Sequence, residues 1–272
     1  MESEPLTRPE KPGYTGTVST GGPADVRELS GLRISKLSVG PMDNNAYLLE
    51  CTATGDGLLI DAANEADRLL ELTNGISLRR IVTTHRHRDH WQALSAVVEQ
   101  SGATTSAHPL DGAELPVPVS DPVEHGDKVS VGQVELSVIH LRGHTPGSIA
   151  LLWDRDGKHS DPSQGSGQLR PAAHSDPSQG SGQLRPAAHS HPSQGSGQLR
   201  PAAHLFTGDS LFPGGPGNTF GNTEDFLSLM DDLEERVFAV LPDDTWVYPG
   251  HGSDTTLGAE RPHLAEWRAR GW

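Results

Sequence analysis

The apolar residues of this chain alternate between short β-type runs and longer patterns of helical period. Short runs rich in Val, Ile and Leu that end at Gly, Pro, Asn or Asp are typical of strands. They predict strands at 33–39, 45–51, 57–60, 80–83, 103–107, 128–131, 133–141, 147–153, 204–207 and 245–248. Apolar positions three and four residues apart predict helices at 64–73, 90–101, 222–240 and 258–269. Strand clusters with helices between them favour a layered α/β or α+β domain.

Two segments break this pattern. Residues 1–30 are rich in Pro, Gly, Ser, Thr and charge, which predicts a flexible N-terminal tail before a domain spanning 31–272. Residues 159–203 contain three tandem copies of a 15-residue unit, and only His191 differs between copies. Each unit offers one Leu and two Ala, too little apolar surface to offset the entropy of ordering. We therefore expect a disordered insertion in the domain.

The flanks of the insertion read as one β-hairpin. Removing 159–203 joins Lys158 to His204, so that a strand ending near Trp153 meets a polar Asp-Gly turn and a second strand from Leu205. Insertions are best tolerated at such exposed loop tips. The repeats are thus predicted to extend the tip of a hairpin.

Composition excludes several classes of function. The net charge is −15 and the pI is about 5.3, whereas nucleic-acid binding needs a basic footprint, so no nucleic-acid partner is expected. No apolar run reaches membrane-spanning length and the N-terminus has no secretory pattern, which favours a cytoplasmic protein without a membrane partner. Cys51 is the single cysteine, so no intramolecular disulfide can form, and we expect it to be buried at a strand end.

The densest chemistry lies just after the predicted strand 80–83. His85, His87, Asp89 and His90 follow the spacing His-x-His-x-Asp-His on a strand-to-helix loop. Imidazole and carboxylate groups are metal ligands, and loops held by a rigid scaffold commonly carry functional side chains.

Three further candidate ligands come after later strands. His144, Asp209 and His251 each follow a glycine, which permits tight turns and close approach of the backbone. Taken singly each has a simpler interpretation: Asp89 could cap a helix, Asp209 could be a turn residue and His251 a loop histidine. Taken together in this order, they indicate a metal site.

The four motifs in this order resemble the metallo-β-lactamase superfamily, and most closely its glyoxalase II-like hydrolases. The motifs are His-x-His-x-Asp-His, Gly-His-Thr-Pro-Gly, Gly-Asp and Pro-Gly-His-Gly, within residues 32–257 without the repeats. This resemblance implies a four-layer αββα sandwich with metals at one edge of its sheets. Because only 21 residues follow His251, the chain is similar to the short forms that lack a C-terminal helical domain.

The resemblance also implies a role for each candidate residue. Two zinc ions are expected, with iron or manganese as alternatives, and a bridging hydroxide would attack a carbonyl with Asp89 and Asp209 as the catalytic carboxylates. Asp61 would not bind a metal itself but would orient a metal-bound imidazole. The implied ligands are His85, His87 and His144 for one metal, Asp89, His90 and His251 for the other, and Asp209 between them.

Three activities remain open for such a site. The first is hydrolysis of a thioester, an S-acyl conjugate of a small thiol. The second is a mononuclear iron persulfide dioxygenase that would use only His85, His144 and Asp209. The third is hydrolysis of a lactone or another ester at the same two-metal site. The small-molecule thioesterase is favoured because the full set of seven ligands is present, although the iron enzymes often keep it too.

Overall fold

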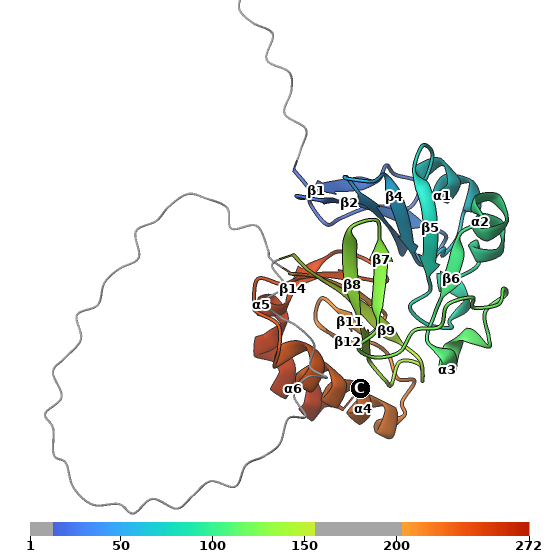
Figure 1. Ribbon diagram of the computed structural model, residues 1–272. Coiled ribbons are helices and arrows are strands. Elements are labelled where there is room, and N and C mark those ends of the chain that lie inside the picture. The colour runs from blue at the N-terminus through green and yellow to red at the C-terminus, as the bar shows by residue number, and fades with distance from the viewer. Residues whose placement is uncertain (1–12, 156–202, 272) are drawn as a thin grey trace, which may run out of the picture. The chain divides into compact units, whose positions relative to one another are not determined.

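The computed structural model describes residues 13–155 and 203–271, which form two six-stranded sheets with helices on their outer faces (Figure 1). The first sheet runs antiparallel from β1 to β4 and then parallel from β4 to β6. Its strands in spatial order are β1 (Asp25–Glu28), β2 (Leu32–Val39), β3 (Asn44–Cys51), β4 (Asp56–Ile60), β5 (Ser77–Val82) and β6 (Thr104–Ser106).

The second sheet is also mixed, with β10 and β13 parallel and the remaining neighbours antiparallel. A small hairpin of β11 (Leu211–Phe212) and β12 (Gly215–Pro216) follows β10. The strands of the second sheet in spatial order are β14 (Thr255–Thr256), β13 (Trp246–Pro249), β10 (Ala203–Gly208), β9 (Ile149–Asp154), β8 (Val134–His140) and β7 (Lys128–Val131).

Three apolar clusters separate four layers. The central cluster joins the inner faces of the two sheets, through residues such as Leu49 and Phe206. A second cluster packs the outer face of the second sheet on α4 and α6, and a third packs the first sheet on α1 and α2 (Figure 1). The helices are α1 (Ala66–Leu72), α2 (Leu94–Ser101), α3 (Pro109–Gly112), α4 (Thr223–Leu233) with a π-helical turn at Glu234–Phe238, α5 (Leu257–Glu260) and α6 (Leu264–Arg270). The αββα sandwich expected from the motifs is confirmed.

The predicted flexible tail is wrong for residues 13–30. Residues 25–28 form β1, which pairs with β2, and Tyr14 packs against Trp246 and Tyr248 of the second sheet. The sequence showed no sign of this ordered structure, because the segment is rich in Pro and Gly and its contacts with distant residues leave no periodic pattern. Residues 1–12 lie outside the described part of the chain.

The predicted hairpin around the insertion is present. Strands β9 and β10 are antiparallel neighbours, and Asp154 pairs with Ala203. Ala203 is fully buried within β10, so the last residue of the third repeat belongs to the sheet. The insertion, predicted to end at residue 203, therefore ends before it. Residues 156–202, which carry the rest of the repeats, lie outside the described residues.

The structure also bears on the single cysteine and on membrane-spanning helices. Cys51 is a free, buried cysteine at the end of β3, as predicted. Among the described residues, no helix is both long and apolar enough to cross a membrane.

Candidate metal centre

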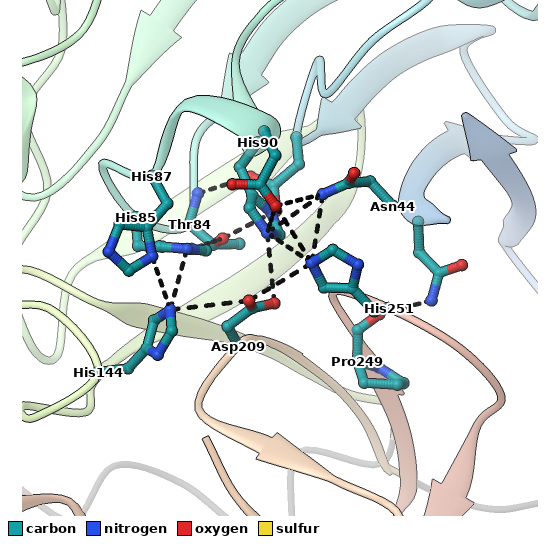
Figure 2. A network of polar contacts seen from close by, with 12 residues as sticks. Asn44, Thr84, His85, His87, His90, His144, Asp209, Pro249 and His251 are labelled. Atoms are coloured by element: carbon teal, nitrogen blue, oxygen red, sulfur yellow. Dashed lines mark hydrogen bonds and ion pairs between the residues drawn. The ribbon is translucent and has the colours of Figure 1, made fainter. Parts of the chain in front are cut away.

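The seven candidate ligands meet where strands of both sheets end. His85 to His90 follow β5, His144 follows β8, Asp209 follows β10 and His251 follows β13. Strands β10 and β13 are parallel, and β8 runs in the same direction because β9 lies antiparallel between β8 and β10. Carboxyl ends of strands with one direction gather at a single edge of a sheet. Residues more than 160 positions apart therefore converge on one point (Figure 2).

Three histidines form the first ligand group. His87 Nδ1 lies 2.9 Å from His144 Nε2, and His85 Nε2 lies 3.2 Å from the same His144 atom. Figure 2 shows the three rings pointing toward one another from two separate loops. Three imidazole nitrogens directed at a common point are a typical ligand set for zinc.

Asp89, His90 and His251 form the second group. Nε2 of His90 and Nε2 of His251 are 3.3 Å apart, and Asp89 Oδ2 lies 3.3 Å from the same His251 atom. The expectation that Asp89 might only cap the following helix is wrong, because helix α2 starts at Leu94 with Ala93 at its N-cap. Residues 88–90 instead form a 3₁₀ turn, which directs Asp89 and His90 to the same side as His251.

Asp209 lies between the two groups. Its Oδ2 is 3.6 Å from His144 Nε2 and 3.5 Å from His251 Nε2, while its Oδ1 is 3.3 Å from His90 Nε2. Gly250 makes this approach possible, because a Cβ there would come within 2.1 Å of Asp209 Oδ1. One carboxylate thus faces both groups of ligands.

The outer ring nitrogens of the histidines are held by protein acceptors. His144 Nδ1 lies 2.8 Å from the Asn218 carbonyl, and His251 Nδ1 lies 2.9 Å from the Met42 carbonyl. A carbonyl can only accept, so each Nδ1 carries a proton, and in the neutral ring Nε2 is then the nitrogen with the free lone pair. This tautomer is the one that a metal ligand requires.

Asp61 supports the ligand loop at the carboxyl end of β4. Its carboxylate accepts hydrogen bonds from the Thr84 amide at 2.7 Å and the Thr84 hydroxyl at 2.8 Å, and Oδ2 lies 2.9 Å from His90 Nδ1. Asp61 is buried and has a φ of 57°, a left-handed conformation that is costly for a non-glycine residue. This conformation places the carboxylate next to His90 Nδ1, as expected for a residue that orients a metal ligand.

Two properties of the cluster fit a bound cation. Asp209 Oδ1 is buried and has no hydrogen-bond partner, which is costly unless an ion compensates it. Burial alone would raise the pKa of Asp209, but the charge on His90 and close polar contacts with His251 and His90 hold that pKa well below its usual range.

The histidines respond to the same charges. Burial and the neighbouring His90 keep the pKa of His85 well below its ordinary value, so its imidazole is neutral and able to ligate. At His251 burial acts to lower the pKa, yet hydrogen bonds to Asp209 and Asp89 raise it to about 10. The paired carboxylates therefore stabilise positive charge at this point, which is the electrostatic environment that suits a divalent cation.

Several residues that the sequence analysis did not single out also contact the site. Asn44 donates from Nδ2 to Asp89 Oδ2 at 2.9 Å (Figure 2). Asp111 is fully buried and accepts from the Arg86 amide at 3.0 Å, the Thr145 hydroxyl and the Gly147 amide at 2.9 Å, which joins the loops of His85 and His144. In the sequence, the Asn44-Asn45 pair at the start of a strand could have indicated a polar role for these side chains, whereas no local pattern marks Asp111.

The rim of the cluster carries exposed apolar side chains. Phe220 is 69% exposed, and its ring centroid lies 5.6 Å from that of His87 and 5.9 Å from that of His144. It has a φ of 55°, which is unusual for a bulky residue. Met42, next to His251 through its carbonyl, is also exposed. Exposed apolar residues thus occur next to histidines of both ligand groups.

The fold and the site define a metal-binding protein of the αββα class. Residues 39–251 match the model of the metallo-beta-lactamase superfamily, so the chain belongs to that superfamily. Among curated relatives, a hydroxyacylglutathione hydrolase from Polaromonas sp. is 31% identical over 210 residues, which cover 76% of this chain and 62% of the relative. A second hydroxyacylglutathione hydrolase, from Fuscovulum blasticum, is 38% identical over 40% of this chain and 43% of the relative. The matched part of this chain thus spans 62% of the first enzyme and 43% of the second.

Solved structures give the same class. ETHE1 from Myxococcus xanthus is 26% identical with a TM-score of 0.61, and the match covers 87% of this chain and 84% of that chain. TTHA1623, solved in a di-iron-bound form, is 28% identical with a TM-score of 0.58 over 83% of this chain and 96% of that chain. These similarities agree with a site that binds metal.

Proposed function

We propose that the protein is a dinuclear metal-dependent thioesterase that hydrolyses an S-acyl conjugate of a small thiol. The observation that carries this proposal is the grouping of seven ligands into two sets that share Asp209. A single-metal enzyme has no need for Asp89 and His251 to converge with His90 beside the first group. The relatives named hydroxyacylglutathione hydrolase support the thioester class.

The proposed cofactor is a pair of zinc ions. His85, His87 and His144 would hold one ion, Asp89, His90 and His251 the other, and Asp209 would contact both. When bound, such ions lower the pKa of water toward neutrality and polarise a carbonyl oxygen. Iron and manganese accept the same imidazole and carboxylate ligands and are the alternative metals.

The carboxylates orient the attacking water. Asp89 receives a hydrogen bond from Asn44, and although burial acts to raise its pKa, hydrogen bonds from His251 and Asn44 hold that pKa far below its usual range. Asp89 is therefore ionised at neutral pH, so Oδ2 can only accept a hydrogen bond. We infer that it aligns the water with the acyl carbon. Asn44 keeps this carboxylate in place.

The reaction balances with water as the only co-reactant. The water oxygen bonds to the acyl carbon, the carbon–sulfur bond breaks, and the sulfur leaves with the bonding electron pair. One water proton ends on the thiolate and the other ionises from the new carboxylic acid. The products are a carboxylate and a free thiol.

The apolar rim favours a substrate with an uncharged acyl group. The exposed Phe220 ring offers apolar surface beside His87 and His144, and the exposed residue Met42 bonds to His251 through its carbonyl. Burial of such surface against a ligand contributes about 25 cal/mol per Å². Lactones and other esters present the same carbonyl and are the alternative substrates of this site.

A mononuclear iron dioxygenase acting on a persulfide is the second candidate. His85 and His144 with Asp209 form a two-histidine, one-carboxylate set, which is typical of iron oxygenases. This reading leaves Asp89, His90 and His251 without a role in metal binding.

The two candidates separate by metal content and by oxygen use. Protein purified without added metal is analysed for zinc, iron and manganese, then assayed on a panel of thioesters and lactones with and without oxygen. We expect two zinc equivalents per chain and thioester hydrolysis that does not depend on oxygen. One equivalent of iron, together with oxygen uptake on a persulfide, would refute the thioesterase.

A further inference from the structure

A buried polar network lies behind the loop that carries His251. At its centre are Lys36 of β2 and Asp254, whose side chains are 0% and 1% exposed and whose Nζ and Oδ1 atoms are 2.6 Å apart. Lys36 Nζ also donates to the carbonyls of Gly16 at 2.8 Å and Gly252 at 2.7 Å. The ammonium group thus bonds directly to the residue after His251.

The N-terminal segment closes the other side of this network. Tyr14 donates its hydroxyl to Asp254 Oδ2 at 2.6 Å, and the Asp254 amide donates to the Gly16 carbonyl at 3.0 Å. Gly16 is pressed so closely against Asp254 that a Cβ there would lie 2.8 Å from the Asp254 Cβ. The segment that composition assigned to a tail is therefore a packed part of the structure around the loop.

The base of the loop is held from the first sheet as well. Asn45 donates from Nδ2 to the carbonyls of Pro249 and Gly252, both at 2.9 Å, and its amide donates to the Gly250 carbonyl at 2.7 Å. Three carbonyls on both sides of His251 thus have donors from a different sheet. This leaves the loop little freedom to move.

The buried ion pair is better suited to positioning than to stabilising the fold. Burial raises the pKa of Asp254 and lowers that of Lys36, so desolvation opposes the charge on each partner. Buried pairs of this kind contribute little net stability, and their best-attested use is to specify one arrangement of the chain. Here the arrangement specified is that of residues 249–254.

We propose that Tyr14, Lys36 and Asp254 form a clasp that positions His251 and thereby sets the affinity of the second metal. This inference rests on the two-metal site proposed above. The clasp acts on His251 alone, because Asp111 and not the clasp braces the loops of His85 and His144. Partners of metal ligands typically change metal affinity about 10- to 100-fold when removed.

The test measures zinc binding and does not depend on turnover. Stepwise zinc affinities are determined by competition with a chromophoric chelator for Tyr14→Phe and for the neutral pair Lys36→Met with Asp254→Asn. We expect the second affinity to fall about tenfold or more and the first to stay unchanged. Tyr248→Phe is the matched control, because it removes a buried hydroxyl that bonds His204 and Arg27 but no residue of the loop.

A double-mutant cycle locates the effect. Combined with His251→Ala, the clasp variants should cause no further loss of zinc affinity, since the ligand they position is gone. An equal loss in both backgrounds, or wild-type second affinity in both clasp variants, would overturn the clasp. Protein that binds two zinc ions with this pattern but cleaves no thioester would instead overturn only the proposed reaction. Binding of a single zinc ion by the wild-type protein would overturn both.

Discussion

At the scale of single residues, Asp209 is the side chain that contacts both groups of candidate ligands. One buried carboxylate faces His90, His144 and His251, and its Oδ1 atom has no hydrogen-bond partner. A polar atom in that position is costly to bury unless a cation compensates it. The structure thus shows, in one side chain, why the two groups of ligands belong together.

Replacing Asp209 by Ala should remove hydrolysis and lower the metal content at both sites. Without the shared carboxylate, the two cations would repel each other unscreened and each group would lose one ligand. Elemental analysis and a thioester assay measure the two losses. Asp121→Ala, which removes a surface carboxylate paired with Arg80, should change neither. If one metal equivalent remains fully bound, the bridging role of Asp209 is incorrect.

The residues of the site differ in how far the sequence revealed them. The seven ligands stand in short motifs, where His-x-His-x-Asp-His or Gly-Asp is visible from neighbouring letters alone. Asp111 and Lys36 have no such local mark, because their partners Thr145 and Gly252 lie 34 and 216 positions away. Their roles depend on contacts that only the folded chain creates.

At the scale of elements, a glycine directly precedes three of the seven candidate ligands, His144, Asp209 and His251. The loop after β8 is the clearest case, since Gly143 has a φ of 126° and a Cβ there would lie 2.3 Å from the Asp225 carbonyl oxygen on α4. On the same loop the Arg142 amide and guanidinium bond to Asp232, also on α4. Helix α4 thus holds the loop that carries His144.

Gly143→Ala should therefore weaken both the fold and the first metal site. The new methyl group must displace either α4 or the loop, and the φ is one that only glycine adopts readily. We expect a loss of more than about 1 kcal/mol in the free energy of unfolding, measured with denaturant, and lower zinc affinity. Gly102→Ala is the control, because Gly102 has a φ of 68° with open space around it. Equal losses in the two variants would mean that the contact with α4 is unimportant.

Most elements followed from local pattern, and the exceptions share a cause. All ten predicted strands are present, including the long runs of β2, β3 and β8. Strands β1 and β14, helix α3 and the β11–β12 hairpin were not predicted, since elements of two to four residues are too short to show a period. The helix predicted from residue 90 starts at Leu94, because residues 88–90 turn more tightly to present ligands.

At the scale of the whole molecule, the described residues on either side of the insertion join as neighbouring strands. Asp154 of β9 pairs with Ala203 of β10, so the two strands that flank the insertion are direct neighbours in the second sheet. The domain is thus interrupted in sequence but continuous in its second sheet.

Deleting residues 159–202 should leave fold and catalysis largely intact. Residues 155–158 would then connect Asp154 to Ala203, and a roughly twelvefold shorter loop lowers the entropy cost of closure by about 2 kcal/mol. We expect an unchanged or higher melting temperature and unchanged turnover, measured by calorimetry and by a thioester assay. A large loss of soluble protein or of turnover would show that the repeats contribute to folding or to the site.

The sequence by itself determined the superfamily, the strand alternation and the seven candidate ligands, because these depend on residues close together along the chain. The tertiary structure alone decided which atoms of Asp209 face each group of ligands, and that residues 13–17 pack against the His251 loop. These features arise from contacts between residues far apart in sequence. Such contacts depend on how two sheets stack, and stacking leaves no periodic pattern in the chain.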